Sequence, residues 1–498
     1  MNTHPSHHAC PDAYPDDTSP TPDSPGRRAF LRRSGQLAVT GTALPFALNL
    51  AAMGEAAAFD ASDYKALVCV FLYGGNDYAN TVVTYDDPSY NTYATVRGGS
   101  GQAGGGIALA KSALAPTLLS PTTPLADGRQ YALNPAMTAM AALFNSGKAA
   151  VQLNVGPLVV PLTRAQYNSV DRKTYPLPPK LFSHNDQQSV WQSLSAEGAT
   201  RGWGGRIGDL ALSSNGRSTF TCISATGNAV FLSGESALPY QVGTNGAVPV
   251  NAIKNNVYGM TAVQGALSTM LQQARSHVLE DEYNKVTARS IAAEVQVSAA
   301  IGGSSTLTTT FPTGNSLADQ LKVVARLIAA RGSLSAKRQV FFVSMGGFDL
   351  HADLMTQHPV VLGKVSEAMN AFYNATVEMG LANQVTAFTA SDFGRTLVSN
   401  GAGSDHGWGS HHFVVGGAVK GKAFYGTAPT VSIGNSSTLA ADQGHVGQGR
   451  LLPTTSVDQY AATLARWFGV ADSELNAILP NLSNFGTTAY PRNMGFMG

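Results

Sequence analysis

Long apolar runs, rather than alternating apolar and polar positions, mark the strands that we expect in this chain. The first run reads ALVCVFL at residues 66–72, and others occupy residues 340–343, 385–388 and 413–415. A further strand is expected at VQLNV, residues 151–155. A strand that is apolar at every position is typical of a parallel sheet covered on both faces. Helical periodicity separates the runs, over residues 135–149, 265–301, 316–331 and 459–469. The pattern predicts an α/β fold with a mostly parallel sheet, against which the helices pack.

Acidic residues and histidines gather at the ends of these runs. They follow three of the runs and precede a fourth: Asp77; Asp349 and His351; Asp392 with Arg395; and Asp405, His406, His411 and His412. Because the functional groups of an open α/β sheet collect beyond the carboxyl ends of its strands, we expect these side chains to meet at one edge. For Asp77, which follows two glycines, two roles stay open: a metal ligand, or the cap of a turn.

The chemistry of this set favours a metal site. Mixed carboxylate and imidazole ligands suit zinc, manganese or iron better than calcium. We therefore predict one or two divalent transition-metal ions, with ligands drawn from Asp77, Asp349, His351, Asp392, Asp405, His406, His411 and His412. Two neighbouring ions can clamp an ester anion and activate an oxygen nucleophile. Arg395 or Arg206 is then available to neutralise a non-bridging oxygen of the ester.

A second candidate feature is the segment FSHNDQQ at residues 182–188. Ser183 followed by Asp186 or Gln187 fits a capping box, which predicts that a helix begins at Ser183. That position allows two interpretations, a helix cap only or a nucleophile. A helix N-terminus attracts phosphate or sulfate, and a metal-activated serine there can attack an ester. His184 is predicted to donate a proton or to contact the anion.

The N-terminal segment has the pattern of an export signal. Residues 1–26 are rich in Pro, Ser, Asp and His and are expected to be disordered. Arg27 and Arg28 then precede an apolar segment at residues 37–53 and an Ala56-Ala57-Ala58 cleavage site. The apolar segment is short for a membrane span, so we expect no stable span in the mature protein. The pattern predicts export of folded protein by the twin-arginine translocase, to the periplasm or out of the cell.

Composition bears on nucleic-acid binding, on the state of the cysteines and on the number of domains. The chain has 498 residues, of which 44% are hydrophobic and only 13% are charged, with a net charge of +1. Nucleic-acid binding needs clustered Lys and Arg, and none is evident. Cys69 and Cys222 lie in apolar runs and are read as buried thiols, a disulfide being the alternative. After a signal over residues 1–58, we predict one domain over residues 59–498, with loop insertions at about 97–127 and 213–260.

Five short motifs together resemble a known family. The segments GGND, FSHNDQQ, GGFDLH, SDFGRT and SDHGWGSHHFVVGG are similar to those of the exported bacterial family called domain of unknown function 1501. That family resembles the alkaline phosphatase and sulfatase superfamily. The resemblance implies a three-layer α/β/α sandwich, alkaline-phosphatase-like, with a metal-assisted Ser, Thr or formylglycine nucleophile. The Cys-x-Pro-x-Arg context that yields formylglycine is absent around Ser183.

The resemblance also implies roles for single residues. Asp77 would be the ligand from the first strand and Ser183 the nucleophile. One metal half-site would consist of Asp349 with His351, and the second of Asp405 with His406. Either His411 or His412 would complete one of them. Asp392 stands where the family commonly has Glu, so Asp392 and Asp405 compete for the second site.

We therefore hypothesise an exported metal-dependent hydrolase that acts on phosphate or sulfate esters, with a small anionic ester or a surface glycan as its ligand. The alternative is a non-catalytic exported protein on the same fold, which binds a metal, a glycan or a partner protein.

Overall fold

The structure, a computed structural model, describes residues 59–98, 106–254, 259–303 and 307–498. The predicted leader, twin-arginine signal and cleavage site at residues 1–58 lie outside the described residues. The described residues from Phe59 to Gly498 form one compact unit. Within the residues that are described, no helix combines the length and apolar character needed to cross a bilayer.

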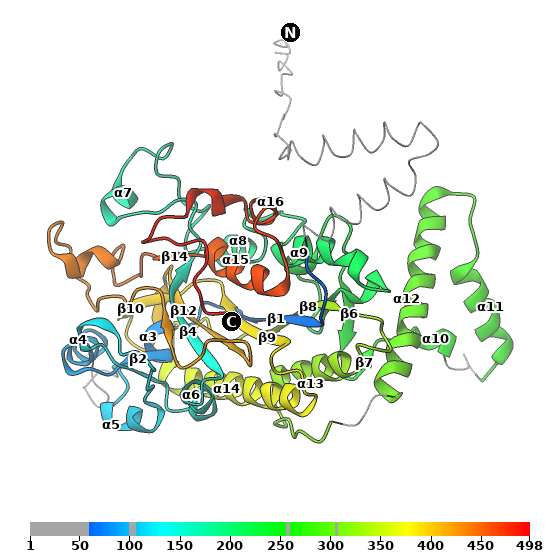
Figure 1. The fold of residues 1–498 in the computed structure, drawn as a ribbon, viewed down its shortest axis with the longest axis horizontal. Helices are drawn as coiled ribbons and strands as arrows, with labels where there is room; N and C mark the ends of the chain where they lie inside the picture. The colour runs from blue at the N-terminus through cyan, green and yellow to red at the C-terminus, as the bar shows by residue number, and fades with distance from the viewer. Residues whose placement is uncertain (1–58, 99–105, 255–258, 304–306) are drawn as a thin grey trace, which may run out of the picture. The chain divides into compact units, whose positions relative to one another are not determined.

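A ten-stranded sheet organises this unit (Figure 1). Its order is β13 (Phe424–Tyr425), β4 (Ala149–Gly156), β12 (Ser410–Gly416), β9 (Val385–Ser391), β1 (Lys65–Leu72), β8 (Arg338–Met345), β5 (Cys222–Ser224), β6 (Tyr240–Gly243) and β7 (Gly246–Ala247), and β14 (Thr455–Ser456) pairs with β4. The pairs around β1 and β8 are parallel, but β12 runs antiparallel to both β9 and β4. The predicted mostly parallel sheet is therefore confirmed, with one reversed strand inside it.

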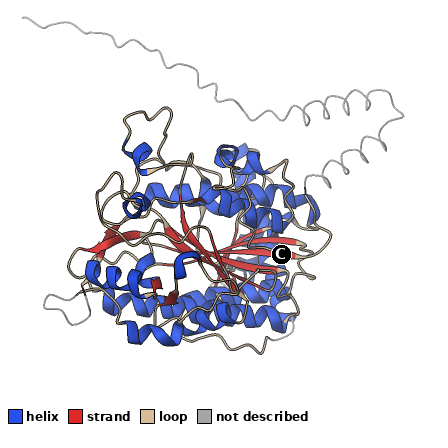
Figure 2. Ribbon diagram, turned by 60° about the vertical axis from the view of Figure 1, so that its left-hand side comes forward, coloured by secondary structure: helices blue, strands red, loops and turns tan. Residues whose placement is uncertain are grey.

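The apolar runs are continuous because both faces of the sheet are covered. Alternate residues of β1 belong to two separate cores: Val68 and Val70 pack with one set of helices, and Cys69 and Phe71 with the other. Helices α6 (Thr138–Asn145), α13 (Ser316–Ala329) and α14 (Leu354–Glu378) contribute to the first core. Helices α8 (His184–Ser193), α9 (Trp203–Ala211) and α15 (Val457–Phe468) contribute to the second. Helices on both sides of the strands (Figure 2) confirm the predicted three-layer α/β/α sandwich.

Smaller elements complete the unit. The helices are α3 (Tyr78–Thr81), α4 (Asp87–Arg97), α5 (Lys111–Leu114), α7 (Arg164–Asn168), α10 (Asn251–Lys254), α11 (Thr261–Gln272), α12 (Val278–Gly303) and α16 (Leu475–Ile478). Two separate hairpins are formed by β2 (Val82–Thr84) with β3 (Tyr131–Leu133), and by β10 (Arg395–Ser399) with β11 (Ser404–His406). Cys69 and Cys222 are both buried and free, as the thiol interpretation predicts.

Two regions differ from the pattern in the sequence. The helical pattern at residues 265–301 is divided between α11 and α12, because Asn284 donates hydrogen bonds to the carbonyls of Met270 and Gln273 and holds a turn between them. The sequence pattern predicts that this helical region packs on the sheet. Helix α11 buries no residue, so the prediction is wrong for α11. The expected insertion at 213–260 includes β5, β6 and β7, which extend the main sheet beyond β8.

Candidate metal centre

The carboxyl ends of three central strands lie level with one another. Leu72 at the end of β1 pairs with Met345 of β8 on one side and with Ser391 of β9 on the other. The loops that follow therefore emerge together. Gly74 makes their contact possible: its φ is +117°, and a Cβ there would lie 2.3 Å from the backbone nitrogen of Asp349. A side chain at this position would separate the β1 and β8 loops.

The reversed direction of β12 brings a fourth segment to the same edge. An antiparallel strand begins where its parallel neighbours end, so the residues before β12 also lie beyond the carboxyl ends. These residues include the β10–β11 hairpin, in which Arg395 pairs with His406. The histidine thereby reaches a loop that leaves the sheet at β8.

Three side chains from distant segments form the centre of the site. His184, Asp349 and His406 each offer one ligand atom, and these atoms all lie within 4.8 Å of one another. Nε2 of His184 lies 3.3 Å from one oxygen of Asp349, and Nε2 of His406 lies 3.3 Å from the other. The side chains are 27%, 44% and 25% exposed, respectively, so the group lies near the surface, although Nε2 of His184 is itself buried.

His351 and Asp405 extend this group. Nε2 of His351 lies 3.0 Å from Nε2 of His406 and 3.1 Å from the Asp349 carboxylate. Its Nδ1 lies 3.1 Å from Asp405, whose carboxylate also accepts a hydrogen bond from Asn400. Burial alone would raise the pKa of Asp405, but these two partners bring it below its ordinary value. The structure thus brings four predicted ligands together, and His184 joins them.

Hydrogen bonds on the far side of two imidazoles direct their free nitrogens into the group. Nδ1 of His184 lies 2.7 Å from Asp392, and this bond raises the pKa of His184. Nδ1 of His406 lies 2.7 Å from the carbonyl oxygen of Phe182. Both partners are acceptors, so each Nδ1 carries the proton. In the neutral ring each Nε2 then keeps a lone pair, which is the usual arrangement behind a metal-binding histidine. Burial lowers the pKa of His406, which favours the neutral ring.

Asp392 and Arg395 lie behind the group rather than in it. The Asp392 carboxylate is fully buried and accepts from Gln188 and the Gly74 amide as well as contacting His184. The side chain of Arg395 has no exposed surface, and its guanidinium donates to Asp349 at 2.8 Å and to the Gly74 carbonyl. Although burial acts to raise the pKa of Asp349, Arg395 lowers it below the ordinary value. Neither residue has the ligand or anion-contact position predicted for it.

Ser183 lies at the start of α8, as predicted, but its side chain does not cap the helix. Its hydroxyl donates to the Asp186 carboxylate at 2.9 Å instead of accepting from a backbone N–H. Asp186 is buried, and Nζ of Lys180 lies 3.6 Å from it. The hydroxyl therefore has an acceptor for its proton, beside His184 in the chain.

Of the two roles predicted for Asp77, metal ligand or cap, the structure shows the cap. Its Oδ1 accepts the backbone N–H groups of Ala79 and Asn80 as the N-cap of α3, and also pairs with Arg97 at 2.9 Å. Its Oδ2 accepts from the Ser404 hydroxyl at 2.9 Å. Burial opposes ionisation, yet the Arg97 charge keeps the pKa of Asp77 low. With both oxygens engaged, Asp77 does not join the group around Asp349.

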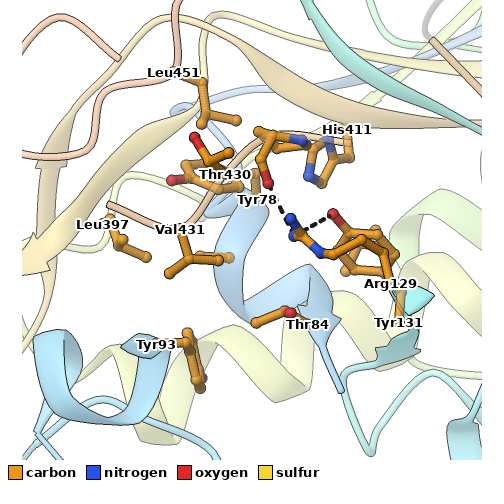
Figure 3. A pocket seen from close by; sticks show the side chains of 13 residues that line it. Tyr78, Thr84, Tyr93, Arg129, Tyr131, Leu397, His411, Thr430, Val431 and Leu451 are labelled. Carbon is orange, nitrogen blue, oxygen red and sulfur yellow. Dashed lines mark hydrogen bonds between the residues drawn. The ribbon is translucent and has the colours of Figure 1, made fainter. Parts of the chain in front are cut away.

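His411 and His412 lie within β12 and are buried on opposite faces of the sheet. Nδ1 of His411 accepts from the backbone N–H of Asn154, and His411 lines a cavity of about 30 Å³ with Arg129 and Tyr131 (Figure 3). His412 packs between Trp191 and Tyr460. Burial lowers the pKa of each histidine to about 3, so both are neutral core residues at ordinary pH. The structure does not place either of them with the predicted half-sites.

Comparison with known proteins gives the family. The model of the family described as "Protein of unknown function (DUF1501)" matches residues 64–479. The chain belongs to this family. The resemblance inferred from its motifs is thereby confirmed. No curated protein matches the sequence.

Three solved structures resemble the DUF1501 chain weakly. The crystal structure of Ps i-CgsB in complex with k-i-k-neocarrahexaose is 8% identical, with 86% of this chain and 78% of that chain covered and a TM-score of 0.32. The PsFucS1 sulfatase from Pseudoalteromonas sp. is 9% identical, with 89% and 72% covered and a TM-score of 0.32. A structure from work on glycosaminoglycan metabolism by Bacteroides thetaiotaomicron is 10% identical, with 73% and 69% covered and a TM-score of 0.28. Similarity at this level says nothing about shared chemistry.

Some residues of the DUF1501 site were not predicted from the sequence. Gln188 follows His184 by four residues, so helical spacing could have placed both on one face of α8, towards Asp392. Phe393 packs against the rings of His184 and His406. Arg97 lies outside every motif, and no local pattern connects it with Asp77.

Proposed function

We propose that this protein is an exported metal-dependent hydrolase that acts on phosphate or sulfate esters. The observation that carries the proposal is the convergence of His184, Asp349 and His406 at the carboxyl edge of the sheet, one residue from a serine at a helix N-terminus. Nε2 of His184 is buried and has no hydrogen-bond partner among the described residues, as expected for an atom kept for a ligand. Two imidazoles and a carboxylate fit zinc, manganese or iron.

Each group of the chain would have a defined task in the reaction. His184, Asp349 and His406 would hold one divalent ion, and His351 with Asp405 would be available for a second. When bound, such an ion supplies Lewis-acid polarisation of the anionic ester group. The Ser183 oxygen would attack phosphorus or sulfur while its proton passes to Asp186 along the existing hydrogen bond. The bond from phosphorus or sulfur to the alcohol oxygen would break, and the alkoxide would leave and take up a proton. Water would then hydrolyse the seryl ester, which releases phosphate or sulfate and restores Ser183. His184 is a ligand in this scheme and not the proton donor.

The nucleophile assignment is tested by Ser183→Ala. This variant should lose ester hydrolysis by about 10³-fold or more, since the attacking atom is removed. Its metal content should stay unchanged, because the Ser183 side chain contacts Asp186 and none of the three ligands. Hydrolysis of p-nitrophenyl phosphate and p-nitrophenyl sulfate, measured beside elemental analysis, reports both quantities.

The matched control is Ser189→Ala on the same helix. Its hydroxyl donates to the carbonyl of Ala196, so its removal should leave turnover intact. Loss of activity in both variants would mean that α8 had been damaged, and full activity in Ser183→Ala would refute the nucleophile.

The second candidate function is non-catalytic binding of a metal, a surface glycan or a partner protein. One observation favours it: the Arg395 guanidinium is buried against Asp349, so it is not free to hold an ester anion. Under this alternative, the wild-type protein binds metal but hydrolyses no ester in the same assays.

Export is the remaining part of the proposal, and it rests on Arg27 and Arg28 ahead of the apolar segment. Replacing both arginines with lysine keeps the positive charge but removes the pair that the translocase recognises. Precursor of full length should then accumulate in the cytoplasm of the producing cell, whereas wild-type protein is processed and exported. Fractionation with immunoblotting measures the ratio, and normal export of the double variant would refute a twin-arginine route.

A further inference from the structure

A buried ion pair lies behind the proposed metal centre. The side chain of Arg97 at the end of α4 has no exposed surface, and that of Asp77 only 1%. A buried charge pair costs much desolvation free energy, and apolar replacements are often as stable. Stability alone therefore does not explain an arginine at this position.

The contacts of this pair converge on the β10–β11 hairpin. Arg97 donates to the carbonyls of Thr396 and Leu397 on β10. Asp77 accepts from the Ser404 hydroxyl on β11. Each member of the pair thus holds one strand of the hairpin, and the 2.9 Å bond between them joins the two strands.

The hairpin needs such an anchor because it has only two strands and lies outside the main sheet. Two-stranded hairpins are marginally stable by themselves. Its strand pairing is also irregular between Arg395 and Ser399. Directional hydrogen bonds from a guanidinium fix a strand in position, which apolar contacts do less specifically.

The hairpin in turn carries groups of the metal centre. His406 is the last residue of β11, and Arg395, the first residue of β10, donates to Asp349 at 2.8 Å. Displacement of the hairpin would move His406 and release the Asp349 carboxylate together. These are two of the three side chains whose ligand atoms converge.

We propose that Arg97 and Asp77 are positioning residues that clamp the β10–β11 hairpin and thereby set the metal affinity of the site without touching the ion. This inference rests on the proposed metal site. It assigns Asp77 a role in the site different from the ligand role that the family motif implies.

The decisive substitution is Arg97→Lys, measured by titration of metal-free protein with Co²⁺. Lysine keeps the charge but lacks the planar fork that reaches Asp77 and two carbonyls at once. Mutation of residues that support metal ligands typically lowers metal affinity by about 10–100-fold. We expect Arg97→Lys to lose Co²⁺ affinity in that range. The visible absorption spectrum of bound Co²⁺ should change as well, because the ligand geometry changes.

Two companion variants separate positioning from folding. Arg338→Lys replaces another arginine whose side chain is fully buried and which pairs with Asp63. Arg338 is the first residue of β8, so it lies at the end of that strand opposite to the proposed metal centre. It should lower the melting temperature without changing Co²⁺ affinity or spectrum. Ser404→Ala keeps the ion pair and removes its link to β11. It also removes the 3.3 Å bond from Nε of Arg395, which still donates to the Ser404 carbonyl oxygen at 3.0 Å. The variant should therefore fold and still bind Co²⁺ more weakly.

The outcomes are distinguishable. Weaker Co²⁺ binding by Arg97→Lys and Ser404→Ala, with normal binding by Arg338→Lys, supports the clamp. Wild-type affinity and spectrum in both hairpin variants would overturn the clamp and leave the metal site standing. Absence of Co²⁺ binding by the wild-type protein would overturn the proposed function and the clamp together.

Discussion

Substitution of Asp349 by asparagine is expected to abolish stoichiometric metal binding. The Asp349 carboxylate is shared: it lies 3.3 Å from His184, 3.3 Å from His406 and 3.1 Å from His351. Asparagine keeps the size of the side chain and can still accept from Arg395, but it removes the negative charge that faces an ion. Mutation of a residue that hydrogen-bonds to a metal ligand lowers metal affinity by up to about 100-fold. Loss of a ligand itself should lower the affinity further.

Elemental analysis of exported protein measures this effect directly. Wild-type protein should carry one or two equivalents of a transition metal, and the Asp349→Asn protein a small fraction of one equivalent. The control is Asp87→Asn, whose carboxylate is 82% exposed and pairs with Lys111 far along the chain from the site. Full metal content in Asp349→Asn, with normal melting behaviour, would place the ion elsewhere and refute the site at the end of β8.

The second large effect concerns stability and lies away from the metal centre. Asp458 at the start of α15 is fully buried beside a cavity of about 70 Å³ that proline, leucine and valine side chains largely line. Its carboxylate is hydrogen-bonded to Asn481 and makes no salt bridge in the described structure. Burial raises the pKa of Asp458 from 3.8 to about 7, against the smaller opposing effect of its bonds to Asn481.

The sign of the pH effect follows from this raised pKa. Between pH 4 and pH 7 the folded state keeps a proton on Asp458 that the unfolded state releases, so stability falls as pH rises through this range. A shift of this size corresponds to about 4 kcal/mol. The asparagine of Asp458→Asn cannot ionise. The unfolding free energy of this variant, measured relative to wild type, should therefore be about 4 kcal/mol higher at pH 8 than at pH 4.

Denaturant unfolding of both proteins at the two pH values measures this difference. Comparing the two pH values cancels any constant cost of the buried amide. Asp472→Asn, a carboxylate that is 77% exposed, should show little such dependence. An equal stability change at pH 4 and pH 8 in Asp458→Asn would show that this carboxyl ionises normally in the folded protein.

The ends of the strands could be predicted from the sequence because they depend on residues that are neighbours in the chain. A run such as ALVCVFL is buried on both faces wherever it occurs, and glycines after it mark a sharp turn. The acids and histidines beyond these runs therefore meet, and Asp349, His351, Asp405 and His406 do so.

Separating ligands from core residues needed the structure. His406 and His411 are five residues apart in one motif, yet β12 begins between them at Ser410. Inside that strand, a histidine packs against either face of the sheet and becomes buried. Asp77 follows its strand as a ligand would, but its role depends on Arg97, which local sequence does not connect with it. Interactions between distant segments decide such cases.

The three converging side chains lie at positions 184, 349 and 406, and this separation affects how the protein matures. Contacts between residues far apart in sequence form slowly, because long loops must close first. No short fragment of the chain contains the complete ion site, and it exists only once the β8 end, the hairpin and α8 have come together. Ion capture at the proposed site would then be a late event in biogenesis. Under the proposed export route, a bound ion would mark a chain that has finished folding before it is translocated.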